Sequence, residues 1–296
     1  MIVAQIDISN PDKVLFPDAD TDMDSPTGLT KRDLAEYYAS VANVMLPHLS
    51  GRPICLERFP DGIDSEGVCD AAPADLPDWI DTVEIEHRTH VLVNNTRTLV
   101  YLASQGCITP HTSLSRTRAL DRPDHLVFDL NPPTDDAVHL LRATALLGEL
   151  LNDIGLTSYL KTGGARGYHV VVPLRPVVTF GETNAFAADV AEHLVTRAPQ
   201  LVTTAPHLPD RGHRIHLDVS RNGFGRTSVP PYAVRAHSGG PVSTPMEWYE
   251  LGTVLPGDHT LVNLRRRLAT RGDPWNGIRR RAHGLTKATE KLARLR

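Results

Sequence analysis

Cysteine, aromatic residues and net charge are all scarce in this sequence. Its 296 residues include three cysteines, and aromatic residues make up 5%. Because Cys55, Cys69 and Cys107 are odd in number and widely spaced, they indicate neither a disulfide framework nor a zinc site, and we expect reduced thiols. The formal net charge of -4 gives no overall basic field, so contact with nucleic acid would have to come from local basic clusters.

Long hydrophobic runs and repeats are also absent. No stretch approaches the length of a membrane span, and the N-terminal MIVAQIDISN lacks the basic and then apolar layout of a signal peptide. We therefore expect a cytoplasmic protein without a membrane partner. Proline and glycine are spread along the chain, which argues against a flexible tether. With 41% hydrophobic residues the chain can bury a substantial core, as one large domain or two intimate lobes.

The first third has the pattern of an α+β structure. After a loop rich in Asp and Pro, Thr30 and Asp33 resemble a capping box that opens a helix over residues 31–45, which Pro47 soon stops. Short β-rich runs predict strands at 54–59, 83–87 and 91–93, the last two as a hairpin.

The middle of the chain predicts a βαββ core. Strands are expected at 126–130, 157–161 and 168–174, with an amphipathic helix at 135–152 that ends at Gly155. Residues 214–220 alternate with period two, which places His216, Asp218 and Ser220 on one face of a strand and an apolar set on the other. Short helices are expected at 245–251 and 259–269, whereas the basic tail at 279–296 could be helical or disordered.

Asp129 and Asn131 form a candidate metal-binding pair. Two positions apart on a strand, their side chains leave the same side of the sheet, and acidic pairs at strand ends commonly hold divalent cations. Asn131 offers one neutral oxygen where a carboxylate would add charge, so at least one metal should bind more weakly. A turn-initiating Asp/Asn-Pro segment explains the same residues.

Other candidates also have ordinary explanations. Asp218 could join Asp129 through strand pairing, or could face solvent on an amphipathic strand. The glycine-rich run from Gly163 to Gly167 could hold phosphates through backbone N–H groups, with Arg166 adding a charge, or could be a hairpin turn. His111 and His169 could be site residues, but the pattern alone favours ordinary hydrogen-bonded histidines.

Ordered blocks along nearly the whole chain resemble one family. These blocks are Asn10–Pro17, Thr30–Lys31, Arg58–Gly62, Leu76–Ile80, Gly106–His111, Arg122–Asp129, Lys161–Pro173, Asp218–Asn222, Tyr232–Arg235 and Pro241–Trp248. Their number, order and spacing resemble the polymerase domain of bacterial non-homologous end-joining DNA ligase D, in the archaeo-eukaryotic primase superfamily.

The resemblance implies an α+β fold of the primase-polymerase type, with a central, mostly antiparallel mixed sheet flanked by helices. It implies a single domain over residues 1–296, with an N-terminal α+β part at 1–120 that holds a DNA-end pocket, a catalytic core at 121–275 and a basic tail at 276–296. It also implies template-dependent nucleotide addition with Mn²⁺ or Mg²⁺.

The resemblance assigns roles to individual positions. Asp129 and Asp218 match catalytic aspartates that bind metal together with position 131, here Asn131. The positions that match a nucleotide site are His111, Gly163, Arg166, Arg221 and Arg235. Those that match a pocket for the 5′-phosphate of a DNA break are Asn10, Lys13, Lys31 and Arg58.

Several positions depart from the family pattern. Asn131 replaces the second catalytic aspartate, Gly163 a nucleotide-site serine, and Arg221 a glutamine. A Phe-Phe pair and a lysine that hold the DNA end are replaced by Gly67-Val68 and Asp70. Because stacking on an aromatic ring contributes about 1–3 kcal/mol per base, this loss should weaken engagement of the template end.

Three functions follow, in decreasing order of support. The first is a DNA/RNA nucleotidyltransferase that uses NTP or dNTP to extend 5′-phosphorylated gaps or breaks and is attenuated by Asn131. It would be associated with the nucleoid and would cooperate with a separate DNA ligase and end-binding protein. The second is a catalytically impaired protein of the same fold that binds and bridges DNA ends. The third, a metal-dependent phosphoesterase, lacks the dense His/Asp cluster that such enzymes use.

Overall fold

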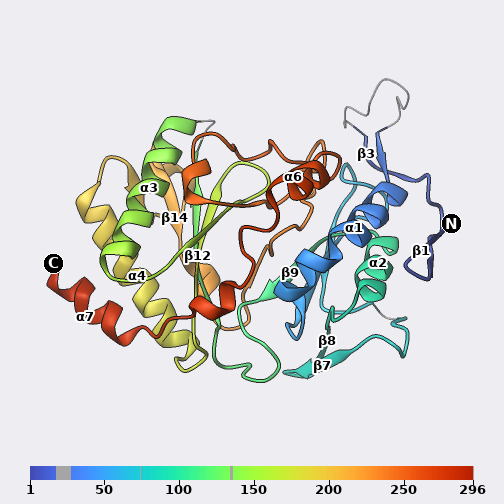
Figure 1. Ribbon diagram of the computed structural model, residues 1–296, viewed down its shortest axis with the longest axis horizontal. Helices are drawn as coiled ribbons and strands as arrows, with labels where there is room; N and C mark the ends of the chain where they lie inside the picture. The colour runs from blue at the N-terminus through green and yellow to red at the C-terminus, as the bar shows by residue number, and fades with distance from the viewer. Residues whose placement is uncertain (18–27, 74, 134–135, 296) are drawn as a thin grey trace. The chain divides into compact units, whose positions relative to one another are not determined.

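The computed structural model describes residues 1–17, 28–73, 75–133 and 136–295 (Figure 1). It divides into two compact units, each built from segments distant in sequence. Unit 1 holds residues 1–113, 229–244 and 257–273, and unit 2 holds 114–228, 245–256 and 274–296. The expectation of one domain over residues 1–296 stays a prediction. Most of the expected Asp- and Pro-rich loop, the first residue of the helix expected at 135–152, and Arg296 lie outside the described residues.

Unit 1 packs three helices beside short sheets. Its strands are β1 (Ile2–Val3), β2 (Ile6–Asp7), β3 (Val14–Phe16), β4 (Leu29–Thr30), β5 (Ile54–Arg58), β6 (Val68–Asp70), β7 (Thr82–Ile85), β8 (Arg88–Val91) and β9 (Cys107–Ser113). Its helices are α1 (Lys31–Leu49), α2 (Thr96–Ser104) and α6 (Leu264–Arg271). Strand β5 pairs antiparallel with both β6 and β9, and α1 and α2 contribute to one buried apolar core.

Helix α1 confirms its predicted start and corrects its predicted end. Thr30 and Asp33 form the reciprocal capping box that the sequence indicates. The helix nevertheless continues through Pro47 to Leu49, so the stop at Pro47 was wrong. Pro47 lies in the last turn, and Met45 and Leu49 are fully buried. Burial of these side chains in the core explains why the helix persists where its local propensity is poor.

The hairpin of β7 and β8 is present with a shifted second strand. Strand β8 covers residues 88–91 where the sequence predicted 91–93. Glu86 and His87 both have positive φ, 47° and 62°, so these two residues form the turn rather than the end of the first strand. Two left-handed residues are the geometry that a two-residue hairpin requires, and neither residue is a glycine or an asparagine that would have signalled it.

Unit 2 is built on a six-stranded sheet with the order β13-β14-β10-β12-β11-β16. All neighbouring pairs are antiparallel except β13 with β14. The strands are β10 (His125–Asn131), β11 (Tyr159–Thr162), β12 (Tyr168–Pro173), β13 (Val202–Thr203), β14 (Ile215–Asp218) and β16 (Pro245–Met246). The other elements are α3 (Ala137–Asp153), α4 (Phe180–Arg197), α5 (Leu208–Arg211), η1 (Ser220–Asn222), β15 (Thr227–Ser228), η2 (Trp248–Glu250), η3 (Ile278–Arg281) and α7 (Thr286–Arg294). The mixed, mostly antiparallel sheet and its helices confirm the predicted α+β class.

The two faces of this sheet differ in chemistry. On one face Leu126, Phe128 and Leu130 of β10 are buried with residues of α3 and α4, which lie beside the sheet (Figure 1). On the other face Val127 and Val171 belong to a smaller apolar cluster. This second face also carries polar side chains, among them Asp129 and His169.

Other local predictions were partly right. Strand β14 ends at Asp218, and Ser220 begins the 3₁₀ turn η1 instead of continuing the strand face. The helix expected at 245–251 is strand β16 followed by the 3₁₀ turn η2, and the helix expected at 259–269 is α6, which begins at Leu264. The tail forms η3 and α7. Across the described residues, every helix is too short or too polar to span a membrane.

Candidate active site

Four polar residues form one row across the second face of the unit 2 sheet. Asp129 of β10 lies directly opposite Asp218 of β14 on one side and opposite His169 of β12 on the other. His169 in turn lies opposite Lys161 of β11. Directly opposed residues of antiparallel strands point to the same face, so strand register alone brings two aspartates, a histidine and a lysine together.

The row is hydrogen-bonded and largely withdrawn from solvent. His169 Nε2 lies 3.3 Å from Asp129 Oδ1, and Lys161 Nζ lies 2.9 Å from His169 Nδ1. The exposed fractions are 1% for Lys161, 5% for His169 and 9% for Asp129. Because an ammonium group can only donate, Nδ1 accepts its hydrogen bond and Nε2 carries the hydrogen that faces the Asp129 carboxylate. His169 therefore orients this carboxylate, a role that the sequence left undecided, and Lys161 was missed.

Asn131 extends the same face toward the glycine-rich turn. It lies two residues beyond Asp129 in β10 and opposite His216 of β14. A Cβ added to Gly167 would lie 2.2 Å from the backbone oxygen of Leu130 and 3.5 Å from Asn131 Oδ1. Only glycine permits this approach, so the turn between β11 and β12 lies against the end of β10.

The three other predicted positions in unit 2 lie on turns. Gly163 is buried and its N–H donates to the Gly167 oxygen at 2.6 Å, which closes the glycine-rich turn. Arg166, in the same turn, and Arg221, in η1, have exposed side chains. A Cβ on Gly163 would lie 3.4 Å from His169 Nε2, so this position borders the polar row.

Asn222 fixes the strand that carries Asp129, although the sequence did not mark it as functional. Its Oδ1 accepts from the N–H of Val127 at 2.8 Å, and its Nδ2 donates to the Val127 oxygen at 2.7 Å. The fully buried side chain thus continues the strand pairing past the point where β14 ends. A buried amide that satisfies both backbone groups of one residue is a structural anchor.

Charges near the row also shift the titration of His216. Burial, and then the positive charge of Arg211, lower the pKa of His216, while Asp218 opposes them. Asp218 itself accepts a hydrogen bond from the Ser220 N–H through Oδ1 at 2.8 Å. His216 is therefore held toward its neutral form beside Asn131.

The donor set fits a divalent cation with fewer charges than the family pattern has. Asp129 and Asp218 supply two opposed carboxylates, and Asn131 supplies a neutral oxygen on the same face. Among the described residues, no group of three or more His, Cys, Asp or Glu side chains is arranged to hold a metal ion. Two carboxylates suit one hard cation and leave a second one poorly compensated.

In unit 1, two of the predicted nucleotide-site residues surround Glu57. His111 Nε2 lies 2.9 Å from Glu57 Oε2 across the pairing of β5 with β9. Burial opposes ionisation of Glu57, but His111, Thr109 and Arg235 outweigh it and lower the pKa of the carboxyl to about 2. The structure therefore brings His111 and Arg235 to one carboxylate, which sequence reasoning missed because its partners come from distant strands.

The predicted 5′-phosphate residues meet at the start of α1. The N–H of Lys13 donates to the Asn10 oxygen at 3.1 Å, and the N–H of Lys31 donates to the Lys13 oxygen at 2.9 Å. Burial, and then the charge of Lys13, lower the pKa of the Lys31 ammonium group. Lys13 Nζ also lies 2.5 Å from Asp61 Oδ1. Lys13 and Lys31 therefore lie together at a helix N-terminus, where Asp61 offsets the charge of Lys13.

Arg58 has a different environment from these lysines. It lies in β5 and forms an ion pair with Asp70 of β6, the residue at the position expected to hold a lysine. Arg58 and Asp70 therefore neutralise each other. Gly67, another position that departs from the family pattern, lies against the ring of Phe59, since a Cβ there would come within 2.6 Å of the ring.

Comparison with known proteins identifies relatives over most of the chain. A model of the LigD primase-polymerase domain family matches residues 30–275. The multifunctional non-homologous end joining protein LigD of Pseudomonas aeruginosa is 32% identical over 281 residues, which cover 92% of this chain and 32% of that protein. The bifunctional non-homologous end joining protein LigD of Bacillus subtilis is 30% identical over 250 residues, 83% of this chain and 41% of that protein. The chain thus spans well under half the length of these relatives.

A solved structure supports the same assignment. The polymerase domain of Mycobacterium tuberculosis ligase D, in complex with DNA, superposes with a TM-score of 0.84 at 29% identity. The match covers 94% of this chain and 99% of that one, which confirms the predicted primase-polymerase type of fold. With the family match over residues 30–275, it shows that the chain belongs to the family of LigD primase-polymerase domains.

Proposed function

We propose that this chain is a template-dependent nucleotidyltransferase that extends DNA ends during break repair. The observation that carries the proposal is the direct opposition of Asp129 and Asp218, held by strand register on the polar face of the unit 2 sheet. In the reaction, the 3′-hydroxyl of a primer attacks the α-phosphate of an NTP or dNTP, and pyrophosphate leaves.

The polar row supplies the chemistry of the proposed site. Asp129, Asn131 and Asp218 would hold a divalent cation, Mn²⁺ or Mg²⁺, which when bound offsets the negative charge of the triphosphate. His169 holds the Asp129 carboxylate by its Nε2–H, and Lys161 fixes that tautomer. This keeps the carboxylate aimed, so little reorganisation is needed when substrate binds.

The remaining positions are proposed to bind substrate. Gly163 closes the glycine-rich turn through its N–H, and the exposed charge of Arg166 in that turn suits the triphosphate. Arg221 adds a second exposed charge. His111 and Arg235 of unit 1 are also proposed as nucleotide-binding residues.

Asn10, Lys13 and Lys31 are proposed to bind the 5′-phosphate of a recessed DNA end. Their two ammonium groups match the negative charge of a phosphate monoester, whereas the first N–H groups of α1 already donate within the protein, from Lys31 to the Lys13 oxygen and from Arg32 to the Pro11 oxygen. Arg58 is the weakest member of this set because its charge is balanced by Asp70. DNA ends, a separate ligase and an end-binding protein are the proposed partners, with the nucleoid as the place of action.

Asn131 favours a second candidate, a protein that binds and bridges DNA ends with little catalysis. A carboxamide at this position removes one of three charges that two cations would share. We propose that the polymerase is attenuated rather than inactive, because the opposition of Asp129 and Asp218 and the support from His169 are intact.

Primer extension on a gapped duplex with Mn²⁺ tests the proposal. Asp129→Ala should reduce extension at least about 1,000-fold, since it removes the central ligand of the row. Asp153→Ala, at the exposed end of α3, is the matched control and should retain activity. Equal activity of both variants would overturn catalysis at this site, and undetectable extension by the natural protein with intact binding of DNA ends would favour the bridging function.

A further inference from the structure

A pocket of about 370 Å³ lies in unit 2 at the end of the sheet away from Asn131. Its charged lining comprises five arginines and one aspartate, namely Arg116, Arg118, Arg122, Arg175, Arg279 and Asp124. Backbone bonds fix its walls, because the N–H of Leu174 donates to the Asp124 oxygen and the N–H of Arg175 to the His283 oxygen, both at 2.8 Å. Three distant segments therefore form one preformed basic pocket.

Three of these five arginines have no carboxylate partner among the described residues. Arg116 Nε lies 2.9 Å from Asp124 Oδ2, whereas Arg122 Nε lies 3.7 Å from Asp121 Oδ2 and its Nη1 donates to the Val177 oxygen at 2.6 Å. Arg118, Arg175 and Arg279 are exposed, and no hydrogen bond or ion pair of their guanidinium groups with another described residue is present. Like charges gathered around one pocket repel each other, so an anion that bridges them would be stabilised there.

The chemistry of the lining points to phosphate. Guanidinium forks bind phosphate oxygens in a bidentate manner, and Pro173, Leu174 and Pro176 add an apolar wall against which a sugar can pack. Arg175 lies over Gly284, where a Cβ would come within 3.2 Å of its Nη2, so the absence of a side chain there makes room for the guanidinium. We propose that this arginine pocket binds the phosphodiester backbone of a nucleic acid strand.

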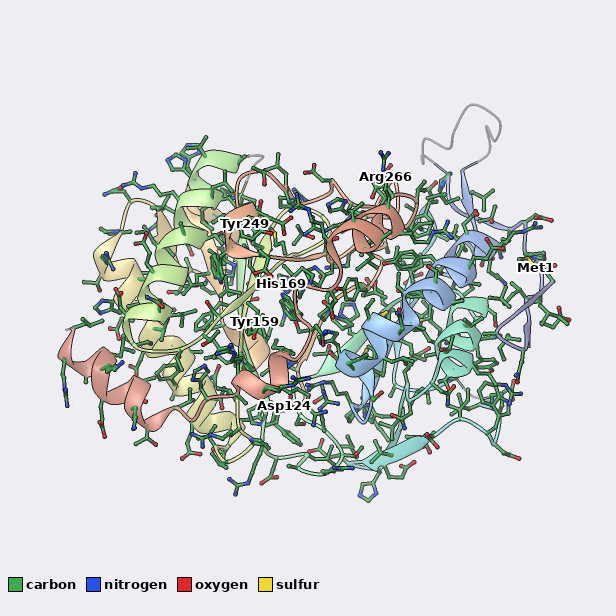
Figure 2. All side chains as sticks on the ribbon, in the orientation of Figure 1. Met1, Asp124, Tyr159, His169, Tyr249 and Arg266 are labelled. Atoms are coloured by element: carbon green, nitrogen blue, oxygen red, sulfur yellow. The ribbon has the colours of Figure 1, made fainter. Side chains whose placement is uncertain are left out.

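The position of the pocket suits a strand that also reaches the polar row. Leu114 and Ile278, next to the pocket in sequence, pack on Val127 and Val171, which lie on the same sheet face as Asp129. Figure 2 shows Tyr159, a neighbour of this apolar cluster, between His169 and Asp124. Asp129 follows Asp124 by five positions, which in an extended strand is a span of about 17 Å. At 3.4 Å per step of a B-form strand this corresponds to about five nucleotides.

The choice of phosphodiester among possible anions rests on the proposed function, but the test does not require catalysis. Fluorescence anisotropy would measure the affinity for a recessed-end duplex, without nucleotide or metal, as a function of NaCl and of the length of the single-stranded part. The variant Arg118→Glu/Arg175→Glu/Arg279→Glu should bind at least tenfold more weakly at 100 mM NaCl. Its slope of log K against log salt should fall by about 2, because each lost contact with single-strand phosphate removes about 0.7.

A matched control carries the same change of charge elsewhere in unit 2. Arg142→Glu/Arg197→Glu/Arg294→Glu alters exposed arginines of α3, α4 and α7 that do not line the pocket. The natural protein and this control should gain affinity as the single strand lengthens to about five nucleotides, whereas the pocket variant should not. Equal weakening of both triple variants would mean a general charge effect and would overturn the proposal.

Two further outcomes separate related ideas. Inorganic phosphate at matched ionic strength should compete poorly with the strand, and displacement as complete as that by unlabelled DNA would identify a small-anion site and overturn the strand proposal. Asp129→Ala should keep the pocket-dependent binding. If that variant also kept full primer extension, the proposed catalytic function would fail while the arginine pocket would stand.

Discussion

The polar row of unit 2 and the proposed 5′-phosphate pocket of unit 1 obtain their geometry in different ways. The second comprises Asn10, Lys13 and Lys31 and is called the lysine pocket below. The row consists of Lys161, His169, Asp129 and Asp218, one from each of four adjacent strands, and its first three members are almost completely buried. The lysine pocket is a turn that lies on the first residues of α1, and Lys13 remains partly exposed. The proposed catalytic alignment is therefore tied to the stability of a sheet, whereas the proposed recognition of a DNA end is tied to a local turn and helix terminus.

The difference predicts how each site fails. Changes in the lysine pocket should alter which DNA ends are bound. The free energy of unfolding should change little at the partly exposed Lys13 and more at the buried Lys31. Changes in the framework of the row should lower stability and activity together.

Among the changes that compare the two sites, the largest expected effect is on recognition of the DNA end. Lys13→Glu/Lys31→Glu should abolish a preference of about 100-fold for 5′-phosphorylated over unphosphorylated recessed ends, since each charged contact to phosphate contributes about 1.5–3 kcal/mol. Competition binding with the two kinds of end measures this. Lys287→Glu/Lys291→Glu on α7 is the charge-matched control. A preference that survives in the pocket variant would place the phosphate elsewhere.

The framework of the row is tested at Asn222. Asn222→Ala leaves both backbone groups of Val127 without their side-chain partner, so we expect a loss of about 2 kcal/mol in the free energy of unfolding. Urea denaturation measures this loss, and the preference for 5′-phosphate should be unchanged. The control is Asn152→Ala, which changes an exposed asparagine of α3. If Asn222→Ala altered phosphate preference and spared stability, the contrast between the two sites would be wrong.

The attenuation of the row is tested at Asn131. Asn131→Asp should raise primer extension about tenfold, equivalent to about 1.4 kcal/mol of transition-state stabilisation, with a larger gain in Mg²⁺ than in Mn²⁺. Asn131→Ala should not show this gain. Robust extension by the natural protein in Mg²⁺ would show that Asn131 does not impair the site.

The smallest effect concerns the half-buried pair of Glu57 and His111 in unit 1. The pKa of Glu57 falls from an ordinary 4.5 to about 2, so its ionised form stabilises the fold above about pH 4.5 and this stabilisation disappears as the pH falls through about 2. Glu57→Gln should therefore lower the free energy of unfolding by about 1 kcal/mol at pH 7, with the difference shrinking steadily in acid. Denaturation at pH 7 and pH 3 checks this. A deficit that grows in acid would contradict the assigned direction.

Much of the local structure was readable from the sequence. The capping box at Thr30 and Asp33 and the alternation around Asp218 depend on neighbouring residues alone, and both are present. The turn at Glu86 and His87 was missed because their left-handed backbone has no local residue signal. Helix α1 passed Pro47 because burial of Leu49 in the core outweighs a local penalty.

The site divides in the same way. The sequence by itself supplied Asp129, Asn131 and Asp218. The alternation of polar and apolar residues along a strand and the resemblance to a family can both be read without coordinates. Only the tertiary structure decided that Asp129 and Asp218 are opposed, that Lys161 and His169 complete their row, and that Asn222 anchors the strand. Strand register and burial join residues that are dozens of positions apart, and no local sequence pattern encodes which of them will meet.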